Sequence, residues 1–348
     1  MKIIHTSGLH LDSSLDFITN SVIQRERKRE INQNLVRLID YAKQNNADRI
    51  IISGGLFGTA PVSLKAITFF LEMVVENPDI DFIVIPSAKE DESDLASRAS
   101  KHPNLKVFGN GSGVLHYADC DVTCVGYMDS YDFDCLDLKE DKVNILVLTG
   151  TVGDNINLSD LKNRNIDYLA LGGNHEYSKG KLDKRGNYAN SGCLDGTCFS
   201  ETGKKGFILL DIGESSVIPE FIPFSERTIH QVILNITDID TYQEIRKNLN
   251  LKLNDIEHED IVLVRLTGTY SLDLIKQNEM LEEALNDRFY YVKISDESKL
   301  KINPKDYEND ISLKGEFIRN VLASDMDEED KNDVIEYGIK ALLKEDLN

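Results

Sequence analysis

Residues 1 to about 224 alternate short apolar runs with helical patterns, and several of these runs end in glycine. The runs that end in this way read ADRIIISGG, KVNILVLTG and IDYLALGG. A strand that is apolar throughout belongs in a sheet covered on both faces, and its alternation with amphipathic helices indicates an α/β fold. The later runs follow one another through short links, so we expect a two-sheet β-sandwich flanked by helices rather than a doubly wound sheet.

The remainder of the chain predicts smaller units. The segment PEFIPFSER has the composition of a boundary, so the first domain is expected at 1–224. Residues 225–298 show a β-α-β-α-β order, which is typical of a small α+β domain. Residues 299–348 form a polar linker and two helices, each with an apolar stripe. The stripes are formed by Leu313, Phe317, Val321 and Leu322, and by Val334, Ile335, Ile339, Leu342 and Leu343.

The chain of 348 residues carries a net charge of −21, which argues against tight autonomous binding to nucleic acid. We therefore expect DNA to be bound only weakly or through a complex. The dense basic run from Arg25 to Arg29 is interpreted as a solvated helix face. The chain shows no membrane-spanning apolar run, signal-peptide pattern or disulfide framework, so we expect a cytoplasmic protein without membrane contact.

The loops after the strands carry a further pattern. They read HTSGLH, ISGGLFG, VIPSAKED, VLTGT and ALGGNHEY. In this order they resemble the motifs of the calcineurin-like metallophosphoesterase superfamily, and the whole chain resembles its SbcD-type DNA repair exonucleases. The resemblance implies a metallophosphoesterase fold with a capping domain. It also implies a phosphodiesterase site in which carboxylates and histidines hold two divalent cations.

At the positions of the family's ligands and catalytic acid, the chain departs from the motifs almost everywhere. Where the resemblance implies aspartate, asparagine or histidine, the chain has Gly8, Gly55, Ala88, Lys89, Thr149 and Gly173. His10 and His175 are retained, and in the family both bind the same metal. A pair of hard cations without carboxylates is not chemically credible, so no catalytic residue is expected and a pseudoenzyme is the favoured interpretation.

Three functions follow from these residues. The first is a non-catalytic subunit or binding module that works with a coiled-coil, SMC-like ATPase through the C-terminal helices, or that forms a homodimer. The second is an active phosphoesterase or nuclease rebuilt around one metal. The third is an anion or nucleotide sensor that uses Lys89 in the emptied cleft.

The metal expectation follows from the two histidines. No cofactor is expected, or at most a single weakly bound divalent ion such as Mn²⁺ or Zn²⁺ at His10 and His175. Asp12, Asn174 and Glu176 are the neighbours that could add a ligand, although a structural role is favoured for Asp12 and Glu176. Because the replaced positions carry mostly small residues, the cleft is expected to stay open.

Overall fold

The computed structural model describes residues 1–58, 61–87, 93–109, 111–128, 131–133, 136–214, 216–271, 274–301 and 304–343. The chain forms two compact units, Met1–Ile229 and His230–Asn348. The division lies close to the boundary expected at 224. No helix in the described ranges has the length and apolar character needed to cross a membrane.

The first unit contains two six-stranded sheets. The first sheet has the order β12-β11-β1-β2-β3-β4, in which β1 to β4 are parallel and β11 is antiparallel to β1. Its strands are Val217–Pro223, Gly206–Ile212, Lys2–Thr6, Ala47–Ile52, Asp81–Val84 and Leu105–Val107 in that order. The second sheet has the order β5-β6-β7-β8-β10-β9. Its strands are Ser112–His116, Asp121–Val125, Asn144–Thr149, Tyr168–Gly172, Asn187–Asn190 and Ser178–Lys181.

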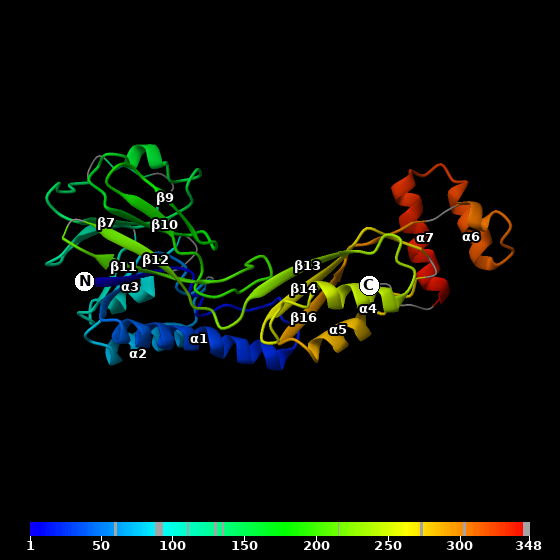
Figure 1. The fold of residues 1–348 in the computed structure, drawn as a ribbon, viewed down its shortest axis with the longest axis horizontal. Helices are drawn as coiled ribbons and strands as arrows, with labels where there is room; N and C mark the ends of the chain where they lie inside the picture. Colours follow the sequence, from blue (N-terminus) through cyan, green and yellow to red (C-terminus); the bar gives the residue numbers. More distant parts are fainter. Residues whose placement is uncertain are drawn as a thin grey trace. The chain divides into compact units, whose positions relative to one another are not determined.

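The apolar strands fill two layers because successive side chains point to opposite faces. In β2, Ile51 lies in the core between the two sheets, whereas Ile50 and Ile52 pack under the helices. Those helices cover the outer face of the first sheet (Figure 1). They are α1 (Ser21–Gln44), α2 (Leu64–Glu76) and α3 (Ser93–Ala99). The predicted α/β class and two-sheet sandwich are therefore confirmed.

The outer face of the second sheet differs from the expectation of flanking helices. Leu146 and Leu148 of β7 point to this face and pack on Ile156, Leu161 and Ile166 from the connection before β8. This connection contains only one 3₁₀ turn, Leu158–Leu161. Loop residues therefore complete this layer.

The second unit has the predicted β-α-β-α-β order with two short additional strands. The elements are β13 (Ile229–Asn235), α4 (Tyr242–Lys252), β14 (Ile261–Thr267), β15 (Thr269–Tyr270), α5 (Asn278–Asn286), β16 (Tyr291–Asp296) and β17 (Lys299–Leu300). Its main sheet has the order β13-β14-β16, and β14 and β16 are parallel. A 3₁₀ turn (Pro304–Tyr307) and the helices α6 (Leu313–Leu322) and α7 (Glu328–Leu343) follow.

The apolar stripes of the two C-terminal helices belong in part to this second core. Ile318 and Val321 of α6 and Ile335 and Ile339 of α7 are buried in the same cluster as the strands. Leu313 remains 68% exposed. The side chains of Leu342 and Leu343 lie outside the described part of the structure. The helices α6 and α7 thus share one core with the α+β segment before them.

Candidate functional site

The loop after β1 continues the backbone pairing of the first sheet beyond the ends of its strands. Gly8 N donates to Gly54 O at 2.9 Å, and His10 N donates to Gly55 O at 3.0 Å. On the other side, Leu194 N donates to Gly8 O at 3.1 Å. This pairing draws three loops together at the edge of the sheet where parallel α/β folds usually place their chemistry.

Gly8 and Gly55 occupy positions in which neighbouring atoms leave no room for a side chain. Both have positive φ angles, 56° and 67°. A Cβ on Gly8 would lie 2.7 Å from Cβ of Cys193, and a Cβ on Gly55 would lie 2.9 Å from Cα of Gly8. Only glycine meets both the conformational and the steric requirement. At these two positions a side chain has no room, because Cys193 and Gly8 lie where it would project.

Two further replaced positions also make close contacts. Thr149 is buried at the end of β7, and its Oγ1 donates to Ser53 O at 3.0 Å, so it links the ends of the two sheets. A Cβ on Gly173 would lie 3.1 Å from Gly150 N. Ala88 and Lys89 lie outside the described residues.

His10 and His175 are brought together as the sequence predicts. Their ring centroids lie 4.8 Å apart, with a 52° angle between the ring planes. Glu201 joins them, because His175 Nδ1 is hydrogen-bonded to Glu201 Oε1. One ligand atom from each of the three residues lies within 4.8 Å of the others, and this is the single such group found among the described His, Cys, Asp and Glu side chains.

Two polar residues that adjoin the histidines in sequence, Asp12 and Asn174, make other contacts. Asp12 accepts hydrogen bonds from Ser63 N at 2.7 Å and Ser63 Oγ at 2.9 Å, beside the first turn of α2. Asn174 Oδ1 accepts from Glu176 N at 3.2 Å. Sequence reasoning missed Glu201, which lies 26 residues beyond His175. No local spacing pattern connects it to the histidines, and the fold of the intervening chain makes the contact.

The three side chains differ in their electrostatic surroundings. Burial would raise the pKa of the Glu201 carboxyl, but hydrogen bonds from His175 and from Thr197 N lower it to about 2. Burial lowers the pKa of His10 to about 4; the nearby His175 lowers it as well, whereas Glu201 acts to raise it. His10 is therefore a neutral imidazole at neutral pH. Its Nε2 is buried and has no hydrogen-bond partner.

These residues do not fit a dinuclear centre of hard cations. Such a centre needs several oxygen ligands, and the positions that would carry them at Gly8 and Gly55 are filled by backbone. They do fit a single borderline-soft ion, because two imidazoles and one carboxylate are a common donor set for Zn²⁺ and related metals. Held there, His10, His175 and Glu201 would supply three ligands to an ion that acts as a Lewis acid.

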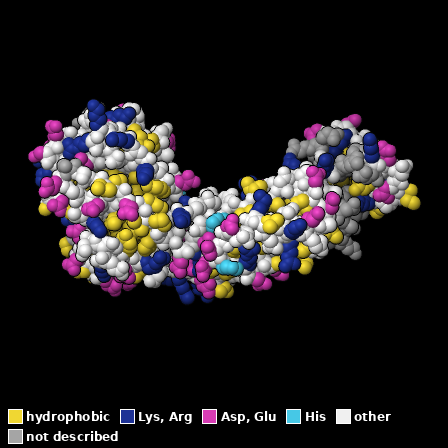
Figure 2. Space-filling model, in the orientation of Figure 1, with side chains coloured by type: hydrophobic (Ala, Val, Ile, Leu, Met, Phe, Trp, Pro, Cys, Tyr) yellow, Lys and Arg dark blue, Asp and Glu magenta, His cyan; other side chains and the backbone are white. Residues whose placement is uncertain are grey.

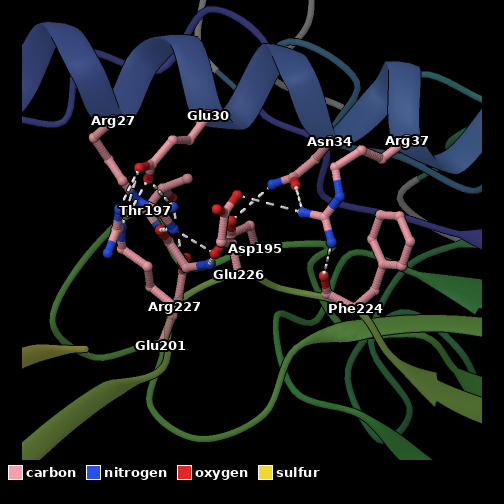
Figure 3. A network of polar contacts seen from close by, with 11 residues as sticks. Arg27, Glu30, Asn34, Arg37, Asp195, Thr197, Glu201, Phe224, Glu226 and Arg227 are labelled. Atoms are coloured by element: carbon pink, nitrogen blue, oxygen red, sulfur yellow. Dashed lines mark hydrogen bonds and ion pairs between the residues drawn. The ribbon is translucent and has the colours of Figure 1, made fainter. Parts of the chain in front are cut away.

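A second polar cluster lies behind Glu201 and is fully buried at its centre (Figure 3). Arg27 of α1 has no exposed side-chain surface and forms an ion pair with Asp195. Arg27 also donates to Glu30 Oε2 at 2.9 Å and to Gly196 O at 3.3 Å. Asn34 Nδ2 donates to the other oxygen of Asp195 at 2.7 Å. Arg27 therefore fixes the segment that leads to Glu201 against α1.

Arg27 corrects the interpretation of the basic run as a solvated face. Arg25, Lys28 and Arg29 are exposed, but Arg27 lies on the inner face of α1. Figure 2 shows that, on the visible part of the described surface, Lys and Arg side chains are mixed with Asp and Glu and do not gather into one stripe. This view offers no continuous track for a phosphate backbone.

Comparisons with known proteins show only a distant structural similarity. No protein-family model matches the chain, and no curated protein matches its sequence. Two solved structures are similar: TT1561 of Thermus thermophilus, and YfcE, a phosphoesterase from E. coli. TT1561 has a TM-score of 0.41 and 13% identity, with 63% of this chain and 98% of that one covered. YfcE has a TM-score of 0.34 and 10% identity, with 64% of this chain and 100% of that one covered. Neither likeness identifies a reaction, ligand or partner of this chain.

Proposed function

We propose that this chain is a non-catalytic relative of the SbcD-type metallophosphoesterases that acts as a subunit or binding module. The observation that supports it is the packing at Gly8 and Gly55. Loss of a carboxylate alone could be reversed by a neighbouring acid. Here atoms of the adjoining loops also lie where side chains at Gly8 and Gly55 would project, which supports the loss of a two-metal centre.

The partner in this proposal is a coiled-coil, SMC-like ATPase that docks on the C-terminal helices. Apolar side chains remain on these helices outside the core: Leu313 of α6 and Tyr337 of α7, which is 58% exposed. An amphipathic helix of a coiled coil buries such side chains as spaced anchors. DNA contact would then come through the complex. A homodimer formed through helices near the cleft of the first unit is the alternative assembly.

A second candidate function is phosphoester hydrolysis by a single metal. The proximity of His10, His175 and Glu201 favours it, since three protein ligands leave a coordination position for water. The two functions make opposite predictions for one assay. Purified full-length protein is incubated with Mn²⁺ or Zn²⁺ and a generic phosphodiester, single-stranded DNA or double-stranded DNA.

The proposed function predicts no hydrolysis above the level of a His10→Ala/His175→Ala double variant. A His102→Ala variant is the matched control, because it removes a histidine far along the chain from the cluster. Hydrolysis by the wild type and the control that disappears in the double variant would overturn the non-catalytic proposal. Docking is tested by co-purification with a candidate ATPase, in which Leu313→Asp and Tyr337→Asp should reduce recovery.

A further inference from the structure

We infer that the first unit binds one transition-metal ion through His10, His175 and Glu201, with Glu201 as a new carboxylate ligand from the segment after β10. The inference concerns metal binding alone. It adds to the proposed function, because one bound ion is compatible with the absence of hydrolysis. It also replaces the weak two-histidine site expected from the sequence with a three-ligand site.

The distances place the three ligand atoms close to the geometry that a metal requires. They lie within 4.8 Å of one another. Zn²⁺ with bonds of about 2.0–2.2 Å brings its donors to about 3.3 Å from one another in a tetrahedral site. His175 and Glu201 are already in direct hydrogen-bond contact. An ion that enters would require His10 to move closer. It would also replace the proton between His175 and Glu201, whose two contacting atoms would have to move apart to about 3.3 Å.

The unsatisfied nitrogen of His10 is the independent sign of a missing ligand. His10 is only 6% exposed, and its Nε2 has no partner. A buried polar atom without a hydrogen bond costs about 1–3 kcal/mol, so native proteins rarely retain one without a reason. A metal at the centre of the cluster would be the partner of a neutral imidazole nitrogen at this position.

The supporting contacts hold the carboxylate in place. Glu201 Oε2 accepts hydrogen bonds from Thr197 N at 2.6 Å and from Thr197 Oγ1 at 3.1 Å. Such outer contacts orient a ligand and are a regular part of metal sites. The residues before Thr197 are fixed in turn by Arg27, which bonds Asp195 and Gly196 O. Glu201 therefore approaches the histidines from a rigid support.

The donor set indicates the class of ion. Two imidazoles and a carboxylate favour Zn²⁺, Co²⁺, Ni²⁺ or Fe²⁺ over Mg²⁺ and Ca²⁺, which prefer oxygen ligands. The side chain of His175 is 45% exposed, whereas that of Glu201 is 6% exposed. Solvent thus reaches the site from the side of His175, so the fourth ligand would be water or a small anion.

The test uses the full-length chain stripped of metal with a chelator. Zn²⁺ is titrated by calorimetry, and Co²⁺ is titrated by visible absorption, which reports a four-coordinate site directly. We expect one ion per chain, a raised melting temperature, and no comparable response to Mg²⁺. Glu201→Gln and His175→Ala should each weaken Zn²⁺ binding by about tenfold or more. Glu176→Gln, an exposed acid next to His175, should leave binding unchanged.

The outcomes separate this inference from the proposed function. No stoichiometric ion in the wild type, or equal affinity in a folded Glu201→Gln variant, would disprove the site. If circular dichroism shows that Glu201→Gln does not fold, His175→Ala carries the test, since its half-exposed side chain tolerates truncation. One bound ion without hydrolysis supports both proposals. One bound ion with hydrolysis supports the site and overturns the non-catalytic function.

Discussion

Two polar clusters of the first unit lie side by side and differ in charge pairing and in access to solvent. Around Arg27, the guanidinium is paired with Asp195 and Glu30, and Asn34 bonds the other oxygen of Asp195, although Arg27 Nε has no partner. Around His10, one nitrogen has no partner and one member, His175, is half exposed. The two clusters are joined by the short segment from Asp195 to Glu201 (Figure 3).

The difference separates a structural role from a binding role. A buried charge network contributes to a fold only when each group is paired, because each ion has lost its hydration. In the Arg27 cluster each charge faces an opposite charge, although Arg27 Nε has no hydrogen-bond partner, and Arg27 itself has no contact with solvent. The His10 cluster keeps a free nitrogen and access to solvent, which are properties of a site that is completed from outside.

The largest effect is expected from Arg27→Ala. Removal of the guanidinium leaves Asp195 buried without its counter-charge, which costs about 3–5 kcal/mol of unfolding free energy. Urea denaturation of the variant should show this loss. Arg29→Ala on the exposed face of the same helix should change the free energy by less than about 0.5 kcal/mol. A small loss for Arg27→Ala would mean that the buried ion pair does not stabilise the fold.

Gly8→Ala is expected to reduce the free energy of unfolding by somewhat less than Arg27→Ala. An alanine at positive φ costs about 1–2 kcal/mol, and overlap with Cys193 adds about 1–3 kcal/mol. Gly153→Ala is the matched control, because Gly153 has φ 89° and nothing within 4 Å of the Cβ position. The difference between the two variants in denaturation measures the packing at the strand ends. Equal losses would show that space for a side chain remains beside His10.

The strands and the two clusters show which features the sequence can predict and which it cannot. Apolar runs with strand periodicity predicted β1, β2, β7 and β8, and the motif order brought His10 and His175 to one edge. Local pattern could not distinguish Arg27 from its exposed neighbours, because its partner Asp195 lies 168 residues away. Glu201 was missed for the same reason. Contacts set by tertiary packing leave no periodic signal in the sequence.

The pH dependence of stability offers a third test. It concerns His5, a buried histidine in which both ring nitrogens have hydrogen-bond partners. His5 Nδ1 contacts Tyr168 Oη at 2.9 Å and Nε2 contacts Ser53 Oγ at 3.0 Å. Burial lowers the pKa of His5 from 6.5 to about 3, against a smaller opposite effect from Leu171. Below pH 6.5 the unfolded chain therefore binds a proton that the native state does not bind until the pH approaches 3.

As the pH is lowered from 6.5 towards 3, protonation of His5 in the unfolded chain should reduce the free energy of unfolding by about 1.4 kcal/mol per pH unit. Denaturation curves at pH 7, 6, 5 and 4 measure the slope. His5→Asn should lower the stability at pH 7 but make the slope shallower by one proton, while His10 contributes equally to both proteins. An unchanged slope would show that His5 is already protonated in the native state.

The smallest effect is expected where the two clusters join. Thr197→Val removes the 3.1 Å hydrogen bond to Glu201 Oε2 and keeps the bond from Thr197 N, so the loss should be about 1 kcal/mol. Thr197→Ser keeps the hydroxyl and should restore most of it in thermal denaturation. A loss as large as that of Arg27→Ala would mean that the clusters form one cooperative network. The His10 group would then contribute to the fold itself and could not be altered by a ligand without loosening α1.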